Sequence, residues 1–100
     1  MTPPSCQFEA AKRLWNIANG HSGQCKTVTR FLLGLYNGNH YPFDLTDLRT
    51  LDPKIFDDCL SALRMDYAPC KEIHDLLEVP GKDFEVLAED WGIKTVRNWR

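Results

Sequence analysis

Residues 22–38 read SGQCKTVTRFLLGLYNG, and this stretch predicts an amphipathic helix. Its apolar side chains recur at the three- and four-residue spacing of one helix face, as Val28, Phe31, Leu32, Leu35 and Tyr36. Ser22 is suited to cap the first turn, because its hydroxyl can accept a hydrogen bond from a free backbone N–H. Asn37-Gly38 is suited to end the helix.

A helix with the same pattern is expected before this one. Its apolar positions are Phe8, Ala11, Leu14, Trp15 and Ala18. We expect Asn19-Gly20 to stop it in a left-handed conformation.

Shorter helices are expected after residue 38. Residues 39–43 form a connection, and Asp44 can cap a brief helix that carries Leu45, Leu48 and Leu51. Asp52-Pro53 predicts a new helix start, since proline at the first helical position loses no hydrogen bond. This helix is expected to turn Asp57 and Asp58 away from one apolar face, which consists of Ile55, Phe56, Cys59, Leu60 and Leu63.

The pattern continues to the end of the chain. Pro69 is expected to open a short helix with Ile73, Leu76 and Leu77 inside. A last helix carries Phe84, Leu87, Ala88 and Trp91 and ends at Gly92. Ile93, Val96 and Trp99 recur every three residues and suit a helical turn or an adhering tail.

The sequence therefore predicts one all-α domain of five or six short helices in an orthogonal array. Residues 1–5 are expected to form a flexible lead, residues 6–92 the domain and residues 93–100 a basic turn or tail. The chain has 100 residues, of which 43% are hydrophobic, enough for one core. No apolar run is long enough to span a bilayer, and no secretory signal is evident, so we expect a cytoplasmic protein.

The charge is unevenly distributed along the chain. The net charge is −2, but residues 1–40 carry +3, residues 41–92 carry −8 and residues 93–100 carry +3. The acidic body indicates a solvated surface or a protein-binding face, and the basic ends leave nucleic acid as an alternative partner.

Catalytic motifs are incomplete. Residues 20–27, GHSGQCKT, approach a phosphate-binding loop, but Cys25 replaces a required glycine and no strand is expected before it. Cys25 with His21 is the best candidate for a nucleophile and its base, whereas Cys59 is expected in the core. His40 and His74 have no partners at metal-ligand spacing, and His74 is expected on a solvated face. We expect no enzyme, no cofactor and no metal.

Two further patterns have ordinary explanations. The carboxylate pairs, such as Glu89/Asp90, lie next to each other on a helix and are expected to be solvated. Residues 45–53 and the helix after them resemble a helix-turn-helix in outline. That helix presents Asp57 and Asp58, which would repel a DNA duplex. If nucleic acid is bound, the first two helices and residues 94–100 are the expected contacts.

FLLGLYNG at 31–38 and YPFDLTDLR at 41–49 resemble a family of small uncharacterised proteobacterial proteins, often carried on plasmids and integrated mobile elements. The likeness continues through Leu51-Asp52, Phe56, residues 58–60, Leu63, Met65-Asp66, His74 and Leu77. It covers about residues 29–77, and 84–92 extend it. The resemblance implies a bacterial origin but no established activity and no catalytic residue.

The functional prediction is a small interaction protein that binds another protein. Aromatic and polar side chains cluster around residues 36–44, where they either pack the connection down or anchor a partner. The acidic face at 57–66 and the C-terminal tail are further candidate contacts. The candidate partner-binding residues are Tyr36, Asn37, Tyr41, Phe43, Asp44, Asp57, Asp58 and Trp99.

Overall fold

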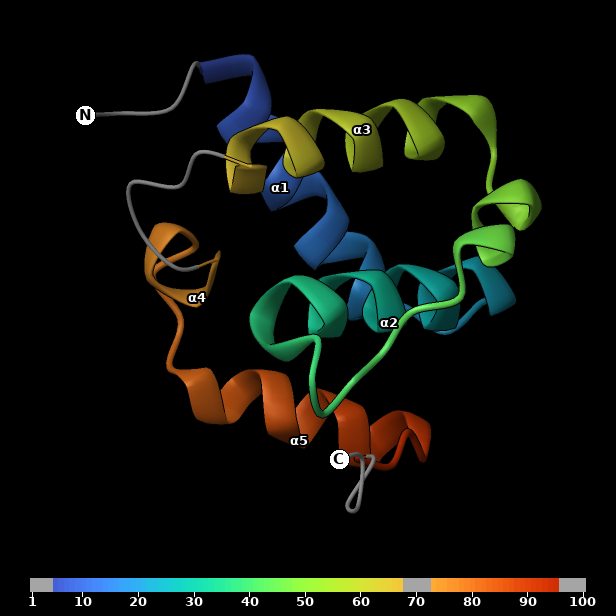
Figure 1. Ribbon diagram of the computed structural model, residues 1–100, viewed down its shortest axis with the longest axis vertical. Helices are drawn as coiled ribbons and strands as arrows, with labels where there is room; N and C mark the ends of the chain where they lie inside the picture. Colours follow the sequence, from blue (N-terminus) through green and yellow to red (C-terminus); the bar gives the residue numbers. More distant parts are fainter. Residues whose placement is uncertain (1–4, 68–72, 96–100) are drawn as a thin grey trace.

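The computed structural model describes residues 5–67 and 73–95, and within these ranges it is built of helices with no strand (Figure 1). The elements are α1 (Ser5–Ala18), α2 (Gly23–Asn37), the 3-10 helix η1 (Leu45–Thr50), α3 (Pro53–Tyr67), α4 (Ile73–Leu76) and α5 (Gly81–Trp91). The prediction of an all-α fold is confirmed.

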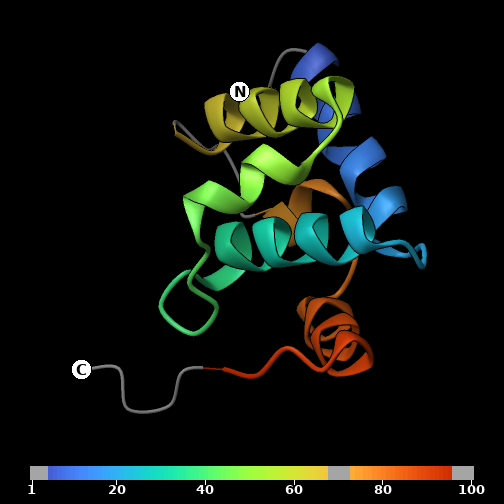
Figure 2. The same ribbon diagram turned by 90° about the vertical axis from the view of Figure 1, so that its right-hand side faces the viewer.

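The helices cross one another at large angles. In both views α2 lies between α3 on one side and α5 on the other (Figures 1 and 2). Figure 2 looks along α5 while α2 runs across the picture, so these two helices are far from parallel. α1 packs against both α2 and α3, and α4 packs against α2 and α5. The result is an orthogonal array, as the short and unequal helices predict.

Local capping accounts for several helix boundaries. The Ser22 side chain accepts a hydrogen bond from the backbone N of Cys25 at the start of α2. The Asp44 carboxylate accepts one from the backbone N of Thr46 at the start of η1, with 2.9 Å between the atoms. Gly92 ends α5 with φ at 72°, in the left-handed region where glycine is favoured. These three boundaries confirm the predicted caps.

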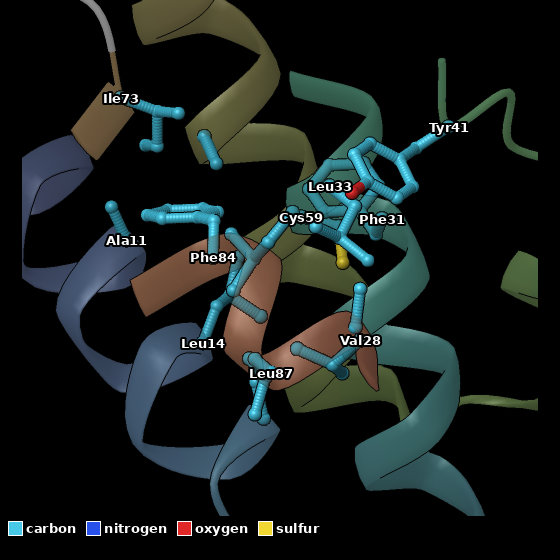
Figure 3. Packing of buried hydrophobic residues seen from close by; sticks show 14 of the residues in the cluster. Ala11, Leu14, Val28, Phe31, Leu33, Tyr41, Cys59, Ile73, Phe84 and Leu87 are labelled. Carbon is cyan, nitrogen blue, oxygen red and sulfur yellow. The ribbon is translucent and has the colours of Figure 1, made fainter. Parts of the chain in front are cut away.

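The core lies where α1, α2, α3 and α5 meet (Figure 3). Phe84 of α5 is fully buried, and its ring centroid lies 4.7 Å from that of Trp15 on α1. Leu14 and Val28 are also fully buried. The apolar stripes predicted for α1, α2 and α5 therefore face this core.

The buried face of α3 differs from the prediction. Leu60 and Leu63 are 43% and 37% exposed, while Ala62 and Met65 are buried beside Cys59. The two possible apolar faces are about a third of a turn apart on the helix. α1 packs against the face with the smaller side chains, which permits close approach of the two helices.

The end of α1 also differs from the prediction. Among the described residues only Glu78 and Gly92 have a positive φ, so Asn19-Gly20 does not form a left-handed stop. Gly20 is needed for another reason. A Cβ at this position would lie 2.8 Å from the Sγ of Cys25 and 3.2 Å from the carbonyl O of Ile17.

Two other predictions are affected by the described ranges. Pro69 and Trp99, with Val96, lie outside them. The described part of the helix expected after Pro69 is α4, with Ile73 buried.

Candidate functional site

A groove of about 700 Å³ lies between the end of α2, the connection that follows it and the last turns of α5. We call it the α2–α5 groove. Its lining residues are Tyr36, Asn37, His40, Tyr41, Glu85, Ala88, Glu89, Gly92, Ile93, Lys94 and Thr95. Three of the predicted partner-binding residues, Tyr36, Asn37 and Tyr41, are therefore brought together here.

Tyr36 is held in place by contacts on several sides. Its ring stacks on Phe84 with 4.9 Å between centroids and meets the ring of His74 edge-on at 5.3 Å. Its hydroxyl donates a hydrogen bond to the Glu85 carboxylate, with 3.0 Å between the oxygens. Gly81 makes this position possible, because a Cβ there would lie 2.9 Å from the Tyr36 hydroxyl oxygen. Tyr36 is thus a rigid, half-buried ring on the wall of the groove.

Asn37 shapes the connection. Its backbone O accepts from the backbone N of Tyr41 at 2.9 Å, which closes the turn after α2. Its side-chain Oδ1 accepts from the backbone N of His40 at 3.3 Å, and its Nδ2 lies 3.3 Å from the His40 Nδ1. These bonds bring His40 and Tyr41 to the groove wall.

The groove has acidic groups on its α5 side. Glu85 and Glu89 lie one turn apart on α5 and are both exposed. Burial raises the pKa of Tyr36, and the hydrogen bond to Glu85 raises it further. Burial also raises the pKa of Tyr41, with smaller contributions from the charges of Glu85 and Glu89. Both tyrosines therefore stay neutral beside the carboxylates at neutral pH.

Two other predicted residues, Phe43 and Asp44, belong to the connection and do not line the groove, and of these Phe43 packs against the core. Phe43 is half-buried, with its ring edge-on to that of Phe31 at a centroid distance of 5.6 Å. Hydrogen bonds from the side chain and backbone of Thr46 lower the pKa of Asp44, which caps η1. Tyr41 both packs in the core and lines the groove, because it is only 8% exposed and still borders the groove.

Asp57 and Asp58 lie on α3, on the other side of α2 from α5 in Figures 1 and 2. Asp57 is exposed, as predicted. Asp58, which was also expected to point away from the packed face of α3, is instead half-buried. Its carboxylate accepts two hydrogen bonds from Arg13 of α1, at 2.9 Å from Nε and 2.7 Å from Nη2. Only 15% of the Asp58 side chain is exposed. The prediction missed this because the partner lies 45 residues earlier in the chain.

The basic N-terminal residues have acidic neighbours. Arg13 is paired with Asp58, and the Nζ of Lys12 lies 3.7 Å from the Glu9 carboxylate. The same Nζ lies 5.1 Å from the centre of the Phe8 ring. These pairs reduce the positive charge that α1 offers to a phosphate backbone.

The candidate nucleophile and base have different surroundings. Cys25 is buried, with its Sγ 3.2 Å from the Ser22 hydroxyl oxygen and against Gly20, whereas His21 is exposed. Cys59 is fully buried, as predicted, and burial raises the pKa of its thiol to about 12.

His74 is not on a solvated face, contrary to the prediction. It is half-buried, and its ring lies edge-on to the rings of Tyr36 and Phe84. α4 packs against both α2 and α5, which places this side chain between them.

Sequence reasoning missed the α5 side of the groove. Glu85, Ala88, Glu89 and Gly92 share the spacing of one helix face, and this was the available signal. The pattern could not show that this face meets Tyr36, which lies 49 residues before Glu85.

Among the described residues, no group of three or more His, Cys, Asp and Glu side chains is arranged to hold a metal ion. None of the helices described combines the length and apolar character needed to cross a bilayer.

The fold defines a small all-α protein with a surface groove. Residues 8–92 match a family of unknown function (DUF7673), and the chain belongs to this family. No curated protein and no solved structure matches the chain.

Proposed function

We propose that this chain is a non-enzymatic interaction protein that binds a basic segment of another protein in the α2–α5 groove. The observation that carries the proposal is the position of Glu85 and Glu89 beside the tyrosine rings of the opposite wall. A carboxylate next to an aromatic face suits a guanidinium or ammonium group, which both attract.

The geometry favours binding over chemistry. Tyr36 is fixed by Phe84, His74 and Glu85, so its ring needs little ordering when a partner arrives. Glu89 is exposed at the same wall and offers its carboxylate to an incoming cation. Lys94 also lines the groove and favours a partner segment that carries an acidic group near its basic residue.

The proposal includes action in a bacterium, as the resemblance to plasmid- and mobile-element-borne proteins implies, and in the cytoplasm, as the sequence leads us to expect. It also includes action without a cofactor. Nucleic-acid binding through the basic ends is the alternative, and the pairing of Arg13 with Asp58 makes it less favourable.

Selection from a displayed library of random peptides tests the proposal. We expect enrichment of peptides with Arg or Lys beside apolar residues, and binding that Glu89→Gln weakens by about tenfold. Asp90→Asn is the matched control, because Asp90 is the next carboxylate on α5 and does not line this groove.

Three results would count against the proposal. They are no enrichment of basic peptides, equal losses in the two variants, or a native partner set that disappears from pull-downs after nuclease treatment. The last result would support the nucleic-acid alternative.

A further inference from the structure

The outer face of α3 carries an apolar stripe that begins at Phe56, which is half-buried against the core, and continues through three exposed side chains. We call it the outer stripe and define it as Phe56, Leu60, Leu63 and Tyr67. The side chains of Leu60, Leu63 and Tyr67 are 43%, 37% and 90% exposed. The spacing of four, three and four residues places all four on one helix face, in the pattern of a two-helix seam. A shallow hollow of about 740 Å³ borders Leu60, Leu63 and Tyr67.

The exposed part of this stripe, Leu60, Leu63 and Tyr67, is not needed for the packing of α3 within the chain. Cys59, Ala62 and Met65 already cover α1 from another face of the same helix. A tyrosine and two leucines exposed together on a helix are typical of an interaction surface. α3 also lies at the edge of the molecule in Figures 1 and 2, where another helix can approach it.

The charges beside the stripe indicate what covers it. Asp57 and Arg64 are both exposed and lie seven residues apart, so they flank the same side of the stripe. If a second α3 packs antiparallel on the first, Asp57 of each copy approaches Arg64 of the other. Leu60 then meets Leu63, and Phe56 meets Tyr67. The same surface is therefore complementary to itself, which is the requirement for a two-fold symmetric contact.

We propose that the outer stripe is the contact between two copies of this chain, packed antiparallel about a two-fold axis that passes near Leu60 and Leu63. This inference does not depend on the proposed function. The contact uses α3, whereas the α2–α5 groove lies across α2 from it and stays open in each copy. The seam spans twelve residues, just under two heptads, so we expect a dissociation constant in the micromolar range, on the order of 10 μM.

Sedimentation equilibrium of the whole chain tests the proposal. We expect the wild type to form a dimer with increasing concentration, and Leu60→Glu to weaken this by at least about tenfold. Val86→Glu is the matched control, because Val86 is 41% exposed on α5, close to the 43% of Leu60. Circular dichroism of each variant checks that the helices remain.

A charge exchange tests the antiparallel arrangement itself. Asp57→Arg and Arg64→Asp are each expected to weaken the dimer, since each places like charges together. The double variant Asp57→Arg/Arg64→Asp is expected to restore it, because the exchanged charges are again complementary. A wild type that stays monomeric at about 0.5 mM overturns the proposal. So do equal effects of the Leu60 and Val86 variants, or a double variant as weak as the single ones.

Discussion

Removing the Thr29 hydroxyl tests how the middle of α2 is joined to the ends of α1 and α5. Thr29 is fully buried in α2, and its hydroxyl lies 2.8 Å from the Cys25 carbonyl O and 3.2 Å from the Ala18 carbonyl O. The Trp91 Nε1 of α5 donates to the same Ala18 oxygen, also at 3.2 Å. Ala18 is the last residue of α1, where carbonyl groups lack partners within the helix. The single Thr29 proton is shared between two carbonyls, and the Ala18 oxygen lies within hydrogen-bond distance of donors from two other helices.

The expected magnitudes follow from how many donors remain. Thr29→Val keeps the side-chain shape and removes one donor, which should lower the free energy of unfolding by about 1 kcal/mol. Trp91→Phe removes the other donor, with a similar loss for the hydrogen bond and a further loss for the smaller ring. The double variant leaves the buried Ala18 carbonyl without either donor. We therefore expect it to be less stable than the sum of the single effects by about 1 kcal/mol.

Urea unfolding of the wild type, the two single variants and the double variant measures this coupling. Thr29→Ser is the control, because it keeps the hydroxyl and should keep most of the coupling to Trp91. If the two losses add to within about 0.5 kcal/mol, the reasoning about a shared acceptor is refuted.

Three further predictions concern packing and titration. Gly20→Ala should destabilise the fold by about 1–3 kcal/mol, because its Cβ would lie 2.8 Å from the Sγ of Cys25, and Cys25→Ala in the same chain should recover part of that loss in urea unfolding. The pKa of Cys59 is raised to about 12, so the neutral thiol is favoured by folding. Its contribution to stability should be complete below about pH 8.5 and decline at higher pH, and thermal unfolding should show a weaker decline for Cys59→Ala. The pKa of Asp44 is lowered by its hydrogen bonds to Thr46, so its contribution is present above about pH 4 and lost as the pH falls through the folded value. The stability difference between wild type and Asp44→Ala should therefore shrink in acid, and a constant difference would contradict this account.

The sequence predicts the parts of the fold that local chemistry controls. Ser22, Asp44 and Pro53 each stand at the predicted helix start, and Gly92 ends the last helix. Each boundary depends on a side chain or ring within a few residues of the helix end. Such signals are readable without knowing the neighbours of the helix.

The choice of the buried face on α3 depends on a partner that the local pattern does not contain. Two apolar faces of α3 have equally regular helical spacing: one contains Phe56, Leu60 and Leu63, and the other contains Cys59 and Ala62. Side-chain size alone would favour burial of the first face, because its side chains are larger and more hydrophobic. α1 selects the second, because small side chains allow closer packing and Arg13 reaches Asp58 beside them. Only the tertiary contact decides between the two.

The sequence predicts the α2 side of the candidate site but not its α5 side. Tyr36, Asn37 and Tyr41 were found from their clustering within six residues of sequence, and they do line one groove. Glu85 and Glu89 were not found, because adjacent carboxylates on a helix are ordinarily solvated. Their relation to Tyr36 arises from the crossing of α2 and α5, which periodicity alone does not specify.

The pairing of α1 with α3 has a consequence for synthesis on the ribosome. α1 can pack against α2 as soon as both helices have emerged, but its surface for α3 is completed only after residue 67. At about 5–20 residues per second, the interval between the end of α2 and the end of α3 lasts on the order of seconds. During that time the face with Leu14 on α1 is only partly covered. We therefore expect the nascent chain to pass through a two-helix stage whose apolar surface is accessible to chaperones, and the bond from Arg13 to Asp58 to form as that stage ends.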